Sequence, residues 1–175
     1  MTKWTIDPTH SEIGFKVKHL MISTVSGKFN RFSVDAETVN DDDFEGAKID
    51  FSADIDSINT GMDQRDTHLK SDDFFNATEF PKLQFKSRSF TKEAKDEFTL
   101  TGDLTIRDVT KPVTLEVTYS GLMQDFYGNW KAGFEAKGKF NRKDFDLKWS
   151  ATTEAGGVVV SDEVKLLLDI QLQRQ

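Results

Sequence analysis

The chain has 175 residues, no cysteine and a formal net charge of −7 at pH 7. A chain of this length is expected to form one domain, spanning residues 1–175, and to bury roughly 70% of its unfolded surface without cross-links. The missing cysteines exclude disulfides and thiolate chemistry. The acidic balance argues against nucleic acids and anionic membrane surfaces as partners.

The first residues carry no recognisable targeting signal. Residues 1–7 lack the apolar core and the small-residue cleavage site of a signal peptide. No segment contains the ~20 consecutive apolar residues that a membrane-spanning helix needs. These features predict a cytoplasmic protein without integral membrane association.

The dominant pattern is an alternation of apolar and polar side chains, which is typical of strands with one buried face. The alternating runs cover residues 12–19, 47–55, 98–106, 113–119, 132–140 and 164–172. Between residues 29 and 34 the apolar positions change parity, which predicts a β-bulge at 30–32. Residues 40–46 are acidic without the spacing of a calcium loop, which favours a solvated loop. Residues 127–130 have the sequence of a tight hairpin turn.

One stretch, residues 62–75, has no alternation. Met62, Arg65, Leu69 and Asp73 recur there at helical spacing. This spacing predicts one short helix at about residues 62–73.

About eight long strands with one clean polar face predict an all-β fold, a single antiparallel barrel with the short helix at one end. The polar face carries charges such as Lys16 and Lys137, which cannot face lipid, so the apolar face is expected to point inward. A barrel of this size has room for packed side chains or for one slender ligand. Gly102, Ala136 and Gly138 share the inward parity. They either leave a hollow or relieve crowding where the sheet bends.

Ten motifs, in this order along the chain, resemble the YceI-like family. They are WTIDPTHS at 4–11, IGFKVKHL at 13–20, GKF at 27–29, NTG at 59–61, RDTHLKSDDFF at 65–75, FPKLQF at 80–85, GDLTIRDVTKPV at 102–113, GFEA at 133–136, NRKDF at 141–145 and VSDEV at 160–164. The resemblance implies a lipocalin-like barrel around an elongated apolar tunnel, which carries polyisoprenoid or other long amphiphilic lipids. It also admits a homodimer. The chain departs from the family pattern in lacking a signal peptide and in having Asp146 where a glycine often follows the NRKDF motif.

The inward-facing positions form the predicted ligand wall. They are Ile13, Phe15, Val17, His19, Phe51, Ile55, Leu83, Phe85, Leu104, Ile106, Leu115, Val117, Phe134, Ala136, Phe140, Leu166 and Leu168. Each apolar residue could instead belong to a dry core, since most buried apolar side chains only pack. His19 has inward parity, which predicts a buried neutral histidine that could touch the polar end of a ligand.

Arg65, His68 and Lys70 place positive charge on the predicted helix. They could meet the head group of a ligand at the barrel mouth. The alternative is local pairing with neighbouring aspartates, as on most solvated helix faces. The three histidines have no metal-ligand spacing, so no metal and no cofactor other than a bound lipid is expected.

The sequence therefore predicts a non-enzymatic protein that binds a long-chain isoprenoid or fatty lipid inside the barrel. Two alternatives remain open. One is an enzyme acting on such a lipid, with His19 or His68 as acid–base. The other is a dry barrel whose surface serves as a stress-related interaction module.

Overall fold

The computed structural model describes residues 1–150 and 159–175. The elements are β1 (Thr2–Ile6), η1 (Pro8–His10), β2 (Glu12–His19), β3 (Ser23–Phe29), β4 (Phe32–Thr38), β5 (Lys48–Asp54), η2 (Ile55–Ser57), β6 (Ile58–Asn59), α1 (Asp63–Lys70), β7 (Lys82–Ala94), β8 (Glu97–Ile106), β9 (Val109–Gln124), β10 (Trp130–Asn141), η3 (Arg142–Phe145) and β11 (Val160–Arg174).

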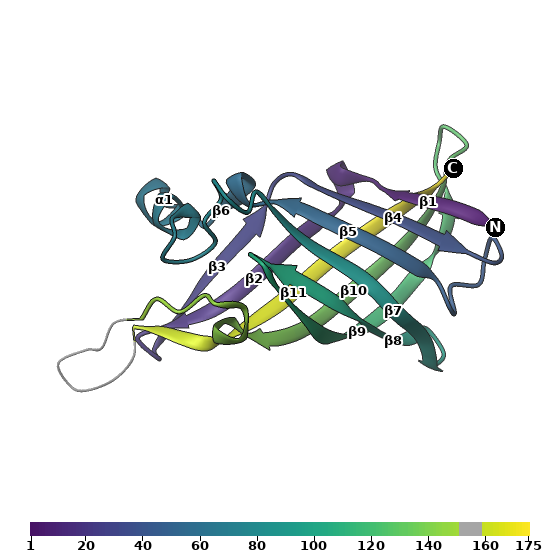
Figure 1. The fold of residues 1–175 in the computed structure, drawn as a ribbon. Helices are drawn as coiled ribbons and strands as arrows, with labels where there is room; N and C mark the ends of the chain where they lie inside the picture. The colour runs from purple at the N-terminus through teal and green to yellow at the C-terminus, as the bar shows by residue number, and fades with distance from the viewer. Residues whose placement is uncertain (151–158) are drawn as a thin grey trace.

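Eight strands close into a ring. Their order is β1-β4-β5-β7-β8-β9-β10-β11, and a further pairing of β1 with β11 completes the circle. All strand pairs are antiparallel. The predicted antiparallel barrel with one short helix at one end is confirmed (Figure 1).

The three remaining strands form a branch outside the ring. One edge of β11 pairs with β10. The other edge pairs with β2 through residues 160–169 and with β1 through residues 172–174. Next to β2 come β3 and the two-residue β6. We call β2 and β3 with their connecting turn the β2–β3 hairpin. It projects beyond the ring at the end where β11 begins (Figure 1).

The chain passes from the ring strand β1 to β2 through the short turn η1. The Asp7 carboxylate caps this turn by accepting from the Thr9 amide at 3.1 Å. It also accepts from Lys131 Nζ at 2.7 Å and lies 2.9 Å from His10 Nδ1. Asp7 and Lys131 are both largely buried, so this cluster ties the start of the chain to β10.

The predicted β-bulge at 30–32 is wrong. Phe29 ends β3, where it pairs with Ile13 and Ile58, whereas Phe32 begins β4 and pairs with Ala53. The change of parity therefore marks a corner at which the chain leaves the branch and joins the ring.

The helix is shorter than predicted, because α1 ends at Lys70. Ser71 stops it with an extended backbone, and its hydroxyl donates to the His68 carbonyl at 2.6 Å. No helix in the described part of the chain has the length and apolar character needed to cross a membrane.

Candidate ligand-binding cavity

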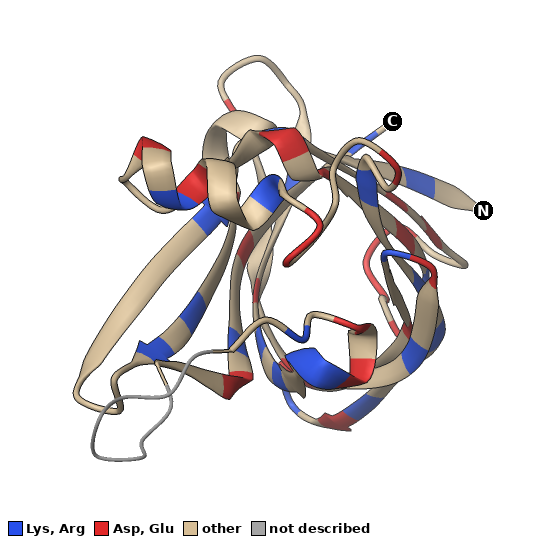
Figure 2. Cartoon of the chain, turned by 60° about the vertical axis from the view of Figure 1, so that its left-hand side comes forward, with Lys and Arg blue, Asp and Glu red and all other residues tan. Residues whose placement is uncertain are grey.

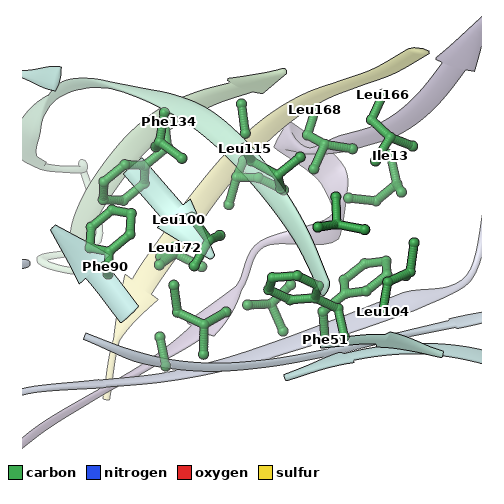
Figure 3. A pocket seen from close by; sticks show the side chains of 18 of the residues that line it. Ile13, Phe51, Phe90, Leu100, Leu104, Leu115, Phe134, Leu166, Leu168 and Leu172 are labelled. Carbon is green, nitrogen blue, oxygen red and sulfur yellow. The ribbon is translucent and has the colours of Figure 1, made fainter. Parts of the chain in front are cut away.

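The inner faces of the barrel strands enclose an apolar cavity of about 140 Å³. It extends from Phe90 and Phe134 to Ile13 and Leu166 (Figure 3). Every residue on its wall is glycine, alanine, valine, leucine, isoleucine or phenylalanine. The wall therefore offers dispersion and hydrophobic contacts but no acid, base or nucleophile.

Most residues of the predicted ligand wall line this cavity. They are Ile13, Phe15, Phe51, Leu83, Phe85, Leu104, Leu115, Val117, Phe134, Ala136, Phe140, Leu166 and Leu168. Strand alternation brings them together, since residues two apart in a strand share a face. Their contact with a ligand stays a prediction.

Four predicted wall residues lie away from the cavity. Ile106 is fully buried in the larger core cluster, and Ile55 sits in η2 within the smaller one. Val17 and His19 lie on β2 between the cavity wall and the hairpin turn. Both are half-buried, so His19 is not the fully buried histidine that its parity predicts.

The wall also contains residues that were not predicted. They are Gly14, Phe29, Val34, Ala36, Phe44, Ala47, Ile49, Phe90, Leu100, Val113, Ile170 and Leu172. Most of them, such as Leu100 beside Leu104, have the same inward parity as predicted neighbours, so the alternation pattern could have identified them.

Phe44 is the exception, because it lies in the acidic segment that was predicted to be a solvated loop. Its side chain is 3% exposed and is inserted into one end of the barrel. Its ring centroid lies 5.0 Å from those of Trp4 and Phe134 and 5.4 Å from that of Tyr119. Burial raises the pKa of Tyr119, and the nearby Asp96 and Asp42 raise it further. This end of the cavity is thus closed by aromatic rings beneath an acidic rim.

The other end of the cavity is also closed by aromatic rings. Phe15 lies 5.8 Å from Phe29, and Phe29 lies 6.3 Å edge-on from Phe75, between ring centroids. Phe75 follows α1 in the chain, and its amide donates to the Leu69 carbonyl at 3.0 Å. The segment that follows the helix therefore packs against the β2–β3 hairpin at this end.

The small inward residues do not all leave a hollow. A Cβ at Gly102 would lie 2.4 Å from the Phe85 ring, and one at Gly138 would lie 2.3 Å from Leu115 Cδ2. These two glycines therefore make room for large side chains on neighbouring strands, and only Ala136 lines the cavity. Such close interdigitation keeps the cavity small.

Arg65, His68 and Lys70 of α1 do not line the cavity either. Arg65 donates from Nε to the Thr60 hydroxyl at 2.7 Å and from a terminal nitrogen to the Thr60 carbonyl at 2.6 Å. His68 Nε2 lies 2.8 Å from the Asp73 carboxylate, and its ring meets the edges of Phe74 and Trp149. Lys70 is half-buried. Arg65 and His68 thus brace loops at this end of the barrel, and contact of the three residues with a head group stays a prediction.

Asp146, the departure from the family pattern, lies in the turn that ends η3. Asp146 has φ 61° and ψ 20°, the left-handed conformation that a glycine adopts without strain. Its amide closes η3 by donating toward the Arg142 and Lys143 carbonyls. Aspartate is among the residues that tolerate this conformation, so this position does not require glycine.

The comparisons with known proteins agree with this architecture. The family model of the YceI-like domain matches residues 4–172. The UPF0312 protein SAB2563 of Staphylococcus aureus (strain bovine RF122 / ET3-1) is 37% identical over 167 residues, which is 94% of both chains.

Two solved structures are also similar. The Campylobacter jejuni YCEI protein is 33% identical, with 97% and 96% of the two chains covered and a TM-score of 0.77. A polyisoprenoid binding domain from Saccharophagus degradans shares the fold at 14% identity, with 98% of both chains covered and a TM-score of 0.73. Because the family model covers nearly the whole chain and a relative is 37% identical over 94% of both chains, the chain belongs to the YceI-like domain family.

Proposed function

We propose that this protein binds one long-chain amphiphilic lipid of the isoprenoid or fatty type inside the barrel, for storage, shielding or transport. The observation that carries the proposal is the wholly apolar wall of the cavity. Each CH₂ group moved from water into such a wall contributes roughly 0.8 kcal/mol, so a long chain gains affinity without any polar contact. The Saccharophagus degradans protein of similar fold, a polyisoprenoid binding domain, supports this ligand class.

The size of the cavity sets a condition on binding. At about 140 Å³, it resembles the engineered apolar cavity of about 150 Å³ that accepts benzene. A longer chain therefore requires wall side chains to rotate outward. The phenylalanines at the two ends, Phe15 and Phe44, are the side chains whose rotation would lengthen the cavity most directly.

A binding role without catalysis fits the distribution of titratable groups. His19 and His68, the two histidines considered as acid–base groups, lie outside the cavity wall. A lipid chain held by this wall would meet only hydrocarbon side chains. A cytoplasmic location and a homodimer stay predictions from the sequence.

The proposal is tested by native mass spectrometry of gently purified protein, followed by organic extraction and lipid mass analysis. A one-to-one adduct of several hundred daltons with isoprenoid or acyl mass spacing is expected. If the protein carries no adduct and takes up neither an added long-chain isoprenoid alcohol nor a fatty alcohol, the proposal is wrong.

A matched pair of variants locates the site. Ala136→Leu places extra carbon atoms in the cavity and should reduce lipid uptake. Gly133→Ala, on the same strand, adds a methyl group that meets Ser120 Cβ at an ordinary 3.4 Å, and uptake should be unchanged. Equal uptake by both folded variants would place the lipid elsewhere.

A further inference from the structure

The turn of the β2–β3 hairpin exposes three consecutive apolar side chains. Leu20 is partly exposed, Met21 is 61% exposed and Ile22 is 85% exposed. The turn stands at the end of the barrel where β11 begins, and the Leu20 amide donates to the Val159 carbonyl at 2.8 Å. Apolar side chains gathered at one projecting tip are typical of a contact surface.

The backbone of this turn does not suit its residues. Leu20 and Met21 have φ of 54° and 60°, and the Ile22 amide donates to the His19 carbonyl at 3.2 Å. Both central φ values are positive, as in a type I′ turn, which strongly favours asparagine and glycine at these two positions. Bulky residues adopt the left-handed region at a cost. The tip therefore keeps apolar side chains that local folding alone would not select.

The hairpin is also the basic part of an acidic protein. From Ile13 to Val34 the sequence contains Lys16, Lys18, Lys28 and Arg31 but no aspartate or glutamate. Lys16 and Lys18 lie on β2 and Lys28 lies on β3. Figure 2 shows basic segments in blue on the hairpin, on the left of the view. Arg31 pairs with Asp54. The three lysines are exposed.

The positive charge continues onto the neighbouring strands. Lys16 lies opposite Lys165 on β11, and Lys165 lies opposite Lys139 on β10, where Lys139 itself pairs with Glu163 at 3.5 Å. Like charges directly opposite one another destabilise a sheet, so this row also has a local cost. Charges are screened beyond about 8 Å at physiological ionic strength. A surface that approaches the hairpin therefore meets its lysines rather than the net charge of the whole chain.

The inner face of the hairpin connects the tip to the cavity. Phe15 lines the cavity, and Val17, the next inward residue, pairs with Val25 on β3. Both valines are half-buried, and only His19 separates them from the exposed turn. An apolar strip thus runs along one face of β2 from the cavity wall to His19, which lies next to the tip.

From the apolar tip, its lysines and the apolar strip that leads to the cavity wall, we propose that the β2–β3 hairpin docks the barrel onto an anionic lipid bilayer. Met21 and Ile22 enter the acyl region, and Lys16 and Lys18 contact the acidic headgroups. Exposed apolar side chains with flanking basic residues are the combination that binds peripheral proteins to anionic membranes. Docking gives the lipid a route from the membrane to the cavity. This part of the proposal rests on the proposed lipid-binding function.

The turn between β9 and β10 provides an internal control. It also exposes aromatic side chains, Phe126 and Tyr127, but at the opposite end of the barrel (Figure 1). The turn itself, residues 125–129, contains Asp125 and no lysine or arginine. An anionic bilayer should repel this tip.

The experiment is flotation of the full chain with vesicles of phosphatidylcholine alone or of phosphatidylcholine and phosphatidylglycerol in equal parts. Wild type should float only with the anionic vesicles and should dissociate as salt is added. The double variant Met21→Ser/Ile22→Ser should weaken binding at least tenfold or so. Each of Lys16→Gln and Lys18→Gln should weaken it about fivefold. Phe126→Ser/Tyr127→Ser should bind as wild type does.

Three results would overturn the docking proposal. They are equal flotation of wild type and the β2–β3 tip variant, loss of flotation only in the β9–β10 tip variant, and a tip-dependent dimer in ultracentrifugation without vesicles. The last would identify a second copy of the chain as the partner. The Ala136→Leu variant should float normally even where it takes up no lipid. Failure of docking and failure of lipid binding are therefore distinguishable.

Discussion

The eight-stranded ring and the β2–β3 hairpin use the same alternation in different ways. In the ring, many inward residues are buried in the larger core cluster, as Leu100 and Leu104 are on β8, and others, such as Leu168, are half-buried and pack against it. In the hairpin, Ile13 and Phe29 are buried at the base, Phe15 and Val17 are half-buried, and the tip is exposed. The ring is therefore a packed scaffold. The hairpin is the part of the barrel whose residues are least constrained by folding and most available for contact.

The largest expected difference concerns one phenylalanine from each region. Phe134 in the ring has its ring centroid 5.0 Å from that of Phe44 and 5.2 Å from that of Tyr119, whereas Phe15 in the hairpin pairs only with Phe29 among the described aromatic residues. Phe134→Ala should lower the free energy of unfolding by about 3–5 kcal/mol, and Phe15→Ala by about half as much. Urea unfolding monitored by tryptophan fluorescence measures both. Equal losses would show that the hairpin is packed as firmly as the ring.

Added methyl groups give the next largest effect. A Cβ at Gly102 in the ring would lie 2.4 Å from the Phe85 ring and 2.5 Å from the Lys86 carbonyl oxygen, which cannot move aside. Gly102→Ala should therefore cost about 3 kcal/mol.

The matching change in the hairpin should cost less, because the three atoms nearest to a Cβ at Gly27 all belong to the Phe15 ring, which is a side chain and not backbone. In Gly27→Ala that ring can rotate toward the cavity. Lipid uptake should therefore fall clearly, while the free energy of unfolding should fall by less than in Gly102→Ala. Gly133→Ala serves as the neutral comparison for both variants. A hairpin variant as unstable as Gly102→Ala would contradict the comparison.

Much of the scaffold could be predicted, because period-two alternation depends only on which face of a strand is buried. It identified the runs around Phe98–Ile106 and Ala132–Phe140 and most of the cavity wall. It could not locate Phe44, whose acidic neighbours predict a solvated loop. Inward parity also does not say how far along the barrel the cavity extends, so Val17 and Ile106 were included in the predicted wall.

The two hairpin turns show that the sequence also predicts backbone conformation only in part. The existence of the β9–β10 turn could be predicted from Gly128, which has a positive φ, but its bounds could not. The loop covers residues 125–129 rather than a tight turn at 127–130, because the Asp125 carboxylate accepts from the Tyr127 and Asn129 amides and Trp130 already pairs with Gln124. The β2–β3 turn carries no glycine or asparagine, so nothing in its sequence indicates a type I′ turn. The residues that sequence reasoning missed there are those that the docking proposal uses.

A smaller effect is expected where the ring and the hairpin join, at Asp7. Desolvation raises the pKa of Asp7, but hydrogen bonds from Lys131, His10 and Thr9 outweigh it and hold the pKa well below its ordinary value. Asp7→Asn should lower the free energy of unfolding by about 2 kcal/mol at pH 7, because it leaves Lys131 without its buried partner.

The pH dependence has a definite sign. Because the folded pKa is depressed, the stabilisation by Asp7 is present above about pH 4 and is lost as the pH falls toward the folded pKa. The difference between wild type and Asp7→Asn should therefore shrink in acid. Unfolding curves from pH 7 to about pH 3 measure this difference. A constant difference over that range would mean that the charge of Asp7 contributes nothing.

The smallest expected effect is an increase in the free energy of unfolding, whereas the variants above lower it. It tests why the hairpin differs from the ring. The double variant Leu20→Asn/Met21→Gly fits the type I′ turn and should raise the free energy of unfolding by about 1 kcal/mol. The same change removes two of the three apolar side chains of the tip, so binding to anionic vesicles should weaken. A more stable protein that no longer floats would show that the wild-type residues are kept for contact at the expense of local stability. If the variant is no more stable than wild type, the turn is not strained, and the case for the tip as a docking surface then depends on its exposure and its charge alone.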